Sequence, residues 1–266
     1  MNNRFLVTAM GAAAMAVTGC AYQGGSGYSH SAYPTYSPYG GTTSYANRCG
    51  TTYTPQGCAV VGGTRLELDI GAEKFVDGDI VNGGIVTGPS TTTAVGYKDA
   101  FKTGYRASAG LARDFRPNTT ILARGFYKQA EGEDGVTIAT NGGGNVNVNF
   151  SDYESYGAEL GLRQYLAPAQ SKFRPFVGAT AGATYIEDIS IDTGGPATLI
   201  NEAGWSATAS ATGGFEMPIS RSASLALESG VRWEGKQDRP AFQTATLGED
   251  NSRLSVPVTL RGRFRF

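Results

Sequence analysis

The sequence is constrained most by a two-residue alternation of apolar and polar side chains that runs up to its last residue. Between residues 253 and 266, the apolar positions are Leu254, Val256, Val258, Leu260, Gly262, Phe264 and Phe266, and the intervening ones are Arg253, Ser255, Pro257, Thr259, Arg261, Arg263 and Arg265. Successive side chains of a β-strand point to opposite faces. The pattern therefore predicts a strand with one apolar and one polar face.

Similar alternating segments recur in the chain before this one. They cover residues 64–75, 101–113, 119–128, 153–166, 172–186, 204–217 and 222–234, of which 119–128 has the least distinct faces. With the last segment they predict about eight strands, each longer than the ~5–6 residues usual in soluble proteins. Strands of this length are sufficient to cross a bilayer when tilted.

Aromatic residues mark both ends of the apolar faces. Trp205 and Phe215 share a face ten positions apart, and Tyr105 and Phe115 have the same spacing. At ~3.3 Å per residue and a tilt of about 40°, this spacing covers about 25 Å, the height of the apolar band between the aromatic girdles of a membrane barrel. Small alanines fill the faces between these aromatic residues.

The connections between the segments alternate in length. Residues 115–118, 167–171 and 218–221 form short turns, whereas residues 76–100, 129–152, 187–203 and 235–251 are long, polar and rich in Gly, Thr, Asn and Asp. Short turns on one side and long loops on the other are typical of bacterial barrels. We therefore predict an all-β fold, an eight-stranded antiparallel up-and-down transmembrane β-barrel over residues 62–266. Pro257 opposes this assignment because it lacks a ladder donor, and we expect a bulge or a disturbed ladder there.

The polar faces carry charges of both signs, which such a barrel places inside. The predicted inward charges are Glu67, Asp69, Glu73, Arg106, Arg124, Glu159, Arg163, Glu216, Glu228, Arg232 and Arg253. The interior of an eight-stranded barrel is just wide enough for side chains to fill, and buried charges are costly unless they are paired. We therefore expect a salt-bridged, plugged interior rather than a conducting pore.

Residues 1–19 are predicted to be an export signal. Arg4 precedes an apolar run that is too short to span a bilayer, and the run ends in Val17-Thr18-Gly19-Cys20. These four residues resemble the lipobox of bacterial lipoproteins, which implies cleavage before Cys20 and lipidation of its sulfur and new amine. Ordinary signal cleavage with an incidental Cys20 is the alternative.

Residues 20–61 are predicted to be a disordered tether that contains a small disulfide loop. The segment is rich in Tyr, Ser, Gly and Pro and has no apolar periodicity, so it cannot bury a core. A disulfide between Cys49 and Cys58 fits an oxidising periplasm. A metal site is the alternative, but the only histidine, His30, lies far up the tether, so we predict no metal and no cofactor.

Composition argues against several classes of function. A net charge of −1 provides no basic surface for nucleic acid. Known outer-membrane barrel hydrolases resemble one another in using a His as general base with a Ser or Asp, and residues 62–266 contain no His. We therefore predict no catalytic residues.

From residue 62 to residue 266 the chain resembles the small outer-membrane β-barrel proteins, the opacity-type and outer membrane protein A-like barrels. Its pattern, strand number and terminal aromatic carry this resemblance, and Phe264 and Phe266 look like the signal that barrel-assembly machinery recognises. The family implies a non-enzymatic structural or adhesion-like role through extracellular loops. It also implies contact with outer-membrane lipids and lipopolysaccharide, and a periplasmic N-terminus that is lipid-anchored if Cys20 is modified. The alternatives are a narrow pore for small solutes, a lipid-modifying enzyme that uses carboxylates, and a soluble periplasmic β-lipoprotein.

Overall fold

The computed structural model describes residues 53–54, 57–58, 63–81, 85–86, 90–91, 94–140, 144–169, 171–220, 222–238 and 251–265. The chain divides into two units, Met1–Val60 and Val61–Phe266. In the first unit, β1 (Tyr53–Thr54) pairs antiparallel with β2 (Gly57–Cys58). The predicted export signal, Cys20 and Cys49 lie outside the described residues, as does Phe266.

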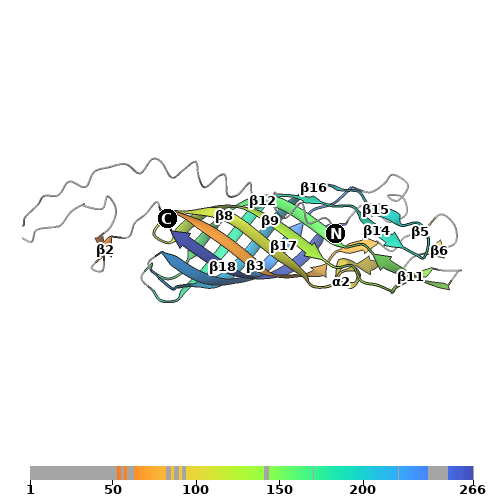
Figure 1. Cartoon of the computed structure of the whole chain (residues 1–266), viewed down its shortest axis with the longest axis horizontal. Helices are drawn as coiled ribbons and strands as arrows, with labels where there is room; N and C mark the ends of the chain where they lie inside the picture. Colours follow the sequence, from red (N-terminus) through yellow and green to blue (C-terminus); the bar gives the residue numbers. More distant parts are fainter. Residues whose placement is uncertain are drawn as a thin grey trace, which may run out of the picture. The chain divides into compact units, whose positions relative to one another are not determined.

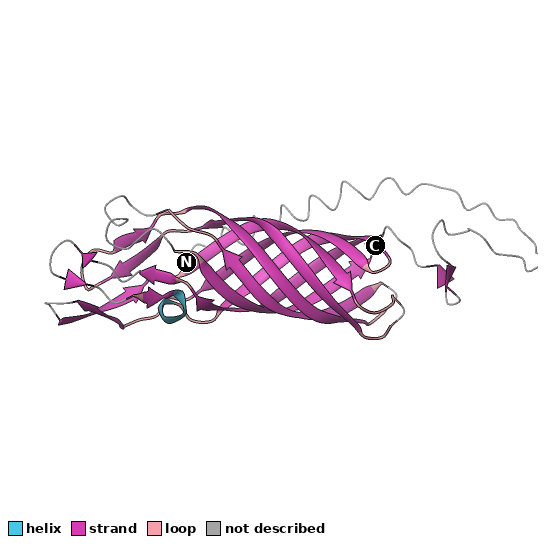
Figure 2. Cartoon of the chain, turned by 180° about the vertical axis from the view of Figure 1, so that it is seen from behind, coloured by secondary structure: helices cyan, strands magenta, loops and turns pink. Residues whose placement is uncertain are grey.

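Eight long strands of the second unit form a closed antiparallel barrel (Figures 1 and 2). They are β3 (Thr64–Asp77), β8 (Gly104–Arg116), β9 (Thr119–Ala130), β12 (Tyr153–Tyr165), β13 (Arg174–Ile186), β16 (Gly204–Pro218), β17 (Ala223–Glu234) and β18 (Arg253–Arg265). Each strand pairs with the next barrel strand along the chain, and β18 closes the barrel by pairing with β3. The predicted fold class, an eight-stranded antiparallel up-and-down barrel, is therefore confirmed.

The observed strands follow the predicted segments with shifts at their ends. β8 begins at Gly104, three residues later than predicted, because Phe101 instead forms an isolated bridge with Gly132. Lys102 therefore precedes the strand, and its ammonium lies 3.0 Å from the Glu131 carboxylate at the surface. The alternation of residues 101–113 predicts Lys102 on the same inward face as Arg106, and this prediction is wrong because Lys102 is not part of the strand.

The alternation produces a charged inside and an apolar outside. All eleven charges predicted to point inward are buried. Outward-facing residues are well exposed, as for Ile70 at 65%, Leu160 at 67% and Trp205 at 66%. The barrel wall is thus inverted relative to that of a water-soluble barrel, which buries its apolar side chains.

The long connections fold beyond one end of the barrel, which we call the loop end (Figure 1). They contain β4 (Asp79–Val81), β5 (Ile85–Val86), β6 (Ser90–Thr91), β7 (Val95–Gly96), α2 (Tyr97–Ala100), β10 (Val136–Thr140), β11 (Gly144–Phe150), β14 (Ile189–Asp192) and β15 (Thr198–Asn201). β10, β11, β14 and β15 form one sheet in that order. Among the described residues, no helix is long and apolar enough to cross a membrane.

The main apolar core lies at the loop end rather than inside the barrel. This loop core comprises Phe75, Ile80, Val81, Val95, Tyr97, Ala100, Phe101, Ala130, Ile138, Val148, Phe150, Tyr153, Ile186, Ile189 and Ile200. Phe101 is central to it, with ring centroids 5.6 Å from Tyr153 and 5.7 Å from Phe75. The sequence predicted only polar loops here, so the loop core is an addition to the predicted fold.

Pro257 interrupts one ladder of β18 without shifting its register. Pairing between β17 and β18 runs to Ser229↔Val258 and resumes at Arg232↔Ser255, whereas the pairing with β3 continues through Pro257↔Glu73. The Ser229 hydroxyl donates to the Pro257 carbonyl at 2.9 Å and satisfies the group that faces β17. The disturbed ladder expected from the sequence is therefore present, and the register shift of β18 lies two residues earlier, between Leu254 and Ser255 in its pairing with β3.

Candidate functional site

The barrel interior is the first candidate site because it collects most of the buried charge of the described residues. Its walls alternate large and small side chains. On β12 the inward positions are Tyr153, Ser155, Gly157, Glu159, Gly161, Arg163 and Tyr165. A Cβ added at Gly157 would lie 2.2 Å from the Ala183 carbonyl oxygen. Glycine thus allows neighbouring strands to approach closely and leaves lumen space for the long charged side chains.

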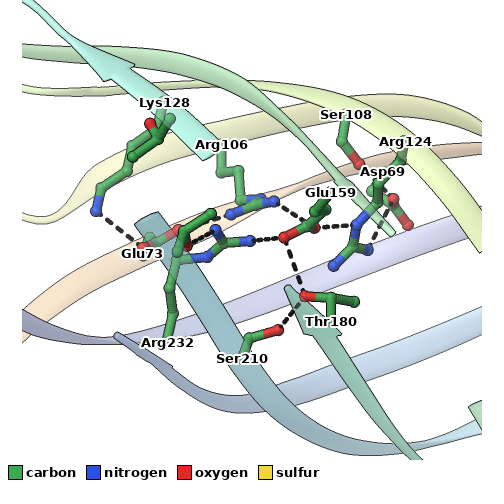
Figure 3. A network of polar contacts seen from close by, with 12 residues as sticks. Asp69, Glu73, Arg106, Ser108, Arg124, Lys128, Glu159, Thr180, Ser210 and Arg232 are labelled. Carbon is green, nitrogen blue, oxygen red and sulfur yellow. Dashed lines mark hydrogen bonds and ion pairs between the residues drawn. The ribbon is translucent and has the colours of Figure 1, made fainter. Parts of the chain in front are cut away.

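Glu159 is the centre of the interior network (Figure 3). One carboxylate oxygen accepts hydrogen bonds from Arg124 Nε and from Arg106 Nη2, the latter at 3.0 Å. The other accepts from Arg232 Nη2 at 2.7 Å and from the Thr180 hydroxyl at 3.0 Å. A single carboxylate therefore ties β12 to β8, β9, β13 and β17.

Two bidentate pairs lie in the lumen nearer the turns. The Arg163 guanidinium donates to both Glu67 oxygens at 2.8 and 3.2 Å, and Arg261 donates to both Glu228 oxygens at 2.8 and 3.0 Å. Arg263 Nη1 donates to Glu216 at 2.7 Å. Fork-to-fork arginine–carboxylate pairs are among the strongest protein hydrogen bonds. The Arg163–Glu67 pair therefore holds β12 and β3, which do not pair directly, whereas Arg261 and Glu228 strengthen the contact between the neighbouring strands β18 and β17.

Lys128 connects the lumen to the loop core. Its ammonium is fully buried, donates to Glu73 at 2.8 Å and lies 4.0 Å from the Phe75 ring centroid. Beside it, Arg253 pairs with Glu234 at 2.9 Å and donates to the Tyr97 hydroxyl at 2.8 Å. The polar interior therefore ends directly under the aromatic side chains of the loop core.

Every buried carboxylate among the described residues has a cationic partner. These carboxylates are Glu67, Asp69, Glu73, Glu159, Glu216, Glu228 and Glu234. The salt-bridged interior predicted from the sequence is thus confirmed, and the cross-lumen partners are what the sequence did not specify. In the part of the chain that the structure describes, no group of three or more His, Cys, Asp or Glu side chains is placed to hold a metal ion.

Phe126 is an inward residue that sequence reasoning missed. It is buried, and the guanidinium carbons of Arg106 and Arg232 lie 4.3 and 4.8 Å from its ring centroid. Both faces of residues 119–128 carry apolar side chains, so composition alone did not separate them. Arg124 and Lys128 each lie two positions from Phe126, and residues two apart in a strand share a face. These two charged residues were therefore the signal that could place Phe126 inside.

The outer face of the barrel is the second candidate site, and aromatic side chains bound it on both sides. A loop-side row consists of Tyr105, Tyr127, Tyr156, Tyr185 and Trp205, from consecutive strands β8, β9, β12, β13 and β16. A turn-side row consists of Phe115, Phe173, Phe215 and Phe264. In this second row, Phe173 and Phe215 stack with their centroids 4.9 Å apart.

Only some of the predicted site residues lie in the described part of the chain. Phe264 is outward-facing, 44% exposed and part of the turn-side row. The backbone of Cys58 lies in β2. Cys20, Cys49 and Phe266 lie outside the described residues, so lipidation, the disulfide and the full assembly signal remain predictions.

Acidic groups at the loop end influence one another. Burial, followed by the nearby Glu154 and Asp188 carboxylates, raises the pKa of Glu187. Lys102 has its pKa raised by its hydrogen bond with Glu131. The loop end is therefore a region in which carboxylates lie close to one another, while Lys102 compensates one of them.

No family model and no curated protein matches the sequence. Solved structures of similar fold include Neisserial surface protein A, with 15% identity and a TM-score of 0.44. That match covers 77% of this chain and 97% of the Neisserial protein's chain. The attachment invasion locus protein Ail of Yersinia pestis has 10% identity, a TM-score of 0.42 and coverages of 77% and 99%. Outer membrane protein OprG from Pseudomonas aeruginosa has 12% identity, a TM-score of 0.43 and coverages of 77% and 97%. These similarities concern the fold alone, and at that level the chain is an eight-stranded up-and-down barrel, as its own strand pairing shows.

Proposed function

We propose that the chain is a non-enzymatic barrel of the bacterial outer membrane, with a structural or surface-interaction role through its loop end. The observation that carries this proposal is the apolar belt on the outside of the barrel. Leu68, Ile70, Leu160, Leu162, Val177, Val231, Val258 and Leu260 are 45–67% exposed between the two aromatic rows. An exposed apolar surface of this extent requires an apolar environment, and aromatic rows at its two rims fit bilayer interfaces.

The interior supports a scaffold rather than a catalyst or a pore. Each of its carboxylates is committed to arginine or lysine, so none is available as a general acid or base. Ion pairs span the lumen, and the loop core lies over one end. The folded loop sheet, β10-β11-β14-β15, is the surface that such a scaffold would present outside the cell.

Surface proteolysis of intact cells tests this proposal. Protease-cleavable tags are inserted at Gly135 and Gly194, two loop-end turns where nothing lies within 4 Å of an added Cβ. A matched tag between Pro117 and Asn118 probes the opposite end. We expect cleavage at the loop-end tags on intact cells, and cleavage at the turn tag only after the outer membrane is opened. The same accessibility at both ends on intact cells, or at neither, contradicts the proposal.

Two measurements address the alternatives. Unheated protein should migrate differently from boiled protein on SDS gels, because membrane barrels resist SDS until heated; identical migration favours the soluble periplasmic lipoprotein. In planar bilayers we expect no discrete conductance steps. Reproducible steps would support the pore hypothesis and exclude a closed lumen.

We further propose that the N-terminal segment is an anchor, with residues 1–19 as signal peptide and residues 20–61 as tether. Support comes from the Val17–Cys20 pattern and the position of Cys20 after an apolar run. The anchor is tested with labelled palmitate, which the wild-type protein should incorporate and the Cys20→Ser variant should not.

The disulfide is tested by thiol labelling, which should reach Cys49 and Cys58 only after reduction. The variant Phe266→Ser tests whether barrel-assembly machinery recognises Phe264 and Phe266. We expect this variant to lose the heat-modifiable form of the protein.

A further inference from the structure

Three basic residues are each next in sequence to a phenylalanine of the turn-side row. The pairs are Phe115–Arg116, Lys172–Phe173 and Phe264–Arg265, and all three bases are exposed. β8 and β18 run toward the turns and β13 runs away from them, so in each pair the base lies on the turn side of its phenylalanine. In the first pair the guanidinium lies over the ring, 5.6 Å from its centroid.

These pairs are distributed around the barrel rather than gathered in one patch. In strand order, β13, which follows Lys172, is three strands from β18, β18 is two from β8, and β8 is three from β13. The three bases therefore form a ring at the turn end. Asp114 does not neutralise this ring, because it is paired with Arg65.

The opposite end carries the opposite charge. Exposed acids at the loop end are Asp77, Asp79, Asp99, Glu131, Asp134, Asp152, Asp188, Asp192, Glu202 and Asp238. The exposed or half-exposed bases described there are Lys74, Lys98, Lys102 and Lys236, and the acids outnumber them. The two rims of the apolar belt are thus electrostatically distinct, and only the turn rim attracts anions.

We propose that the ring of Arg116, Lys172 and Arg265 binds the phosphates of anionic phospholipids in the leaflet at the turn end. This inference rests on the proposed membrane-spanning barrel. Each phenylalanine lies at the rim of the apolar belt. The neighbouring base starts from the opposite face, but it is exposed and lies at the very end of its strand or just outside it, so its long side chain can extend past the rim toward the headgroups. An aromatic ring at the acyl boundary with a cation beyond it fits a lipid that has an apolar tail and an anionic head.

Lipid retention measured on the full-length protein tests the ring. The protein is placed in nanodiscs of equal phosphatidylglycerol and phosphatidylcholine, and the lipids that stay bound after release are counted by native mass spectrometry. We expect phosphatidylglycerol to be enriched at low salt. The variant R116Q/K172Q/R265Q should lose this enrichment, by about five-fold for each base removed, and R116K/K172R/R265K should keep it.

The matched control is K98Q/K102Q/K236Q, which removes three bases from the loop end and should retain the wild-type ratio. The ring proposal is wrong if R116Q/K172Q/R265Q keeps the wild-type ratio, or if the loop-end control loses as much. Insertion is scored separately, by heat-modifiable migration after incorporation into discs of phosphatidylcholine alone. If wild-type protein does not insert there, the membrane-spanning proposal itself is wrong and the ring proposal falls with it.

Discussion

At the scale of single residues, Glu159 illustrates how a barrel of this size tolerates so much buried charge. Its carboxylate lies within 3.0 Å of guanidinium nitrogens of Arg106, Arg124 and Arg232. Burying any one of these charges alone would be very costly, and their mutual attraction offsets that cost only while the set is complete. The network is therefore most sensitive at the residue that the most partners share.

Replacing Glu159 with Gln should destabilise the barrel strongly. The substitution keeps the size of the side chain but leaves three buried guanidiniums without their common counter-charge. We expect the free energy of unfolding in detergent micelles to fall by about 3–5 kcal/mol, measured by denaturant titration. Glu131→Gln removes a surface carboxylate paired with Lys102 and should cost less than about 1 kcal/mol. Equal effects of the two substitutions would show that the interior pairs do not hold the barrel together.

Glu187 should make the loop end slightly more stable in acid. Burial, Glu154 and Asp188 raise its pKa in the folded state, so the folded state binds this proton more tightly than the unfolded state does. Stability is therefore greatest below the ordinary glutamate pKa of ~4.3 and falls as the pH rises through the raised value. The side chain is mostly solvated, so the effect should stay below about 1 kcal/mol.

Glu187→Gln isolates this contribution. The variant should unfold at a higher temperature than wild type at neutral pH and at the same temperature about one unit below the glutamate pKa of ~4.3. Glu202→Gln, an exposed acid at the same end, is the control. A Glu187→Gln variant that is less stable than wild type at neutral pH would reverse the assigned sign.

At the scale of elements, β18 combines barrel closure with an interrupted ladder. The Pro257 carbonyl accepts a hydrogen bond from the Ser229 hydroxyl on β17. In an antiparallel strand the nitrogen and the carbonyl of one residue point to the same side, so the Pro257 nitrogen also faces β17. At this point of β17, Gly230 and Val231 have no ladder partners on β18. The closing ladder with β3 includes Pro257, which pairs with Glu73, and it shifts register only between Leu254 and Ser255. The proline is thus tolerated because its missing donor faces the one neighbour whose ladder is interrupted.

Pro257→Ala should close this gap with little change in stability. The restored hydrogen bond should raise the free energy of unfolding by about 1 kcal/mol. Alanine restricts the unfolded chain less than proline does, which should lower the free energy of unfolding by about 0.4–1 kcal/mol. Amide hydrogen exchange is therefore the decisive measurement. We expect protection at Gly230 and at the new residue 257 amide, with Val258 unchanged as an internal reference. Rapid exchange at both positions would show that strand geometry, rather than the proline, opens the ladder.

The long strands could be predicted from the sequence because their alternation is local. Leu254 to Phe264 shows its two faces without reference to any other segment. The ion-pair partners could not be predicted, because Arg163 reaches Glu67 across the lumen over 96 residues of sequence. The loop core was missed because its strands are short. In β11 only Val148 and Phe150 are buried, and three exposed asparagines separate or precede them, so the segment resembles a polar loop.

The loop core should depend on Phe101 without determining whether the barrel forms. Its ring packs against Phe75, Tyr97, Phe150 and Tyr153. Phe101→Ala leaves a cavity that should cost about 3–5 kcal/mol, concentrated at the loop end. We expect rapid tryptic cleavage after Lys98 and Lys102 while heat-modifiable migration persists. Phe115→Ala removes an equal volume from the exposed outer face and should leave these loop sites protected. Loss of the barrel in Phe101→Ala would mean that the loop core is required for closure.

At the scale of the whole molecule, two different cores stabilise one continuous unit. Ion pairs occupy the interior of the barrel, and apolar side chains fill the loop end. Lys128 and Arg253 join them, since each pairs with a lumen carboxylate and also contacts an aromatic ring of the loop core. The outside is layered in turn into a basic rim, an apolar belt and an acidic loop end. Such layering is what a protein needs if its two ends face different aqueous compartments.

The depth of tryptophans in a bilayer tests this layering directly. Trp205 lies in the loop-side row, Phe215 in the turn-side row, and Ala211 on the same outward face of β16 between them. Three variants with a single tryptophan each are compared in vesicles of brominated lipids: W233F, which keeps Trp205, W205F/A211W/W233F and W205F/F215W/W233F. Bromines near the headgroups should quench positions 205 and 215 most, and bromines near the chain ends should quench position 211 most. If a partner protein covered the same face, none of the three tryptophans would be quenched. If the barrel lay flat on the membrane, all three would lie at similar depths, and bromines at one depth would quench them equally. Maximal quenching of position 211 by deep bromines, flanked by two shallow positions, is the pattern that only a strand crossing the bilayer produces.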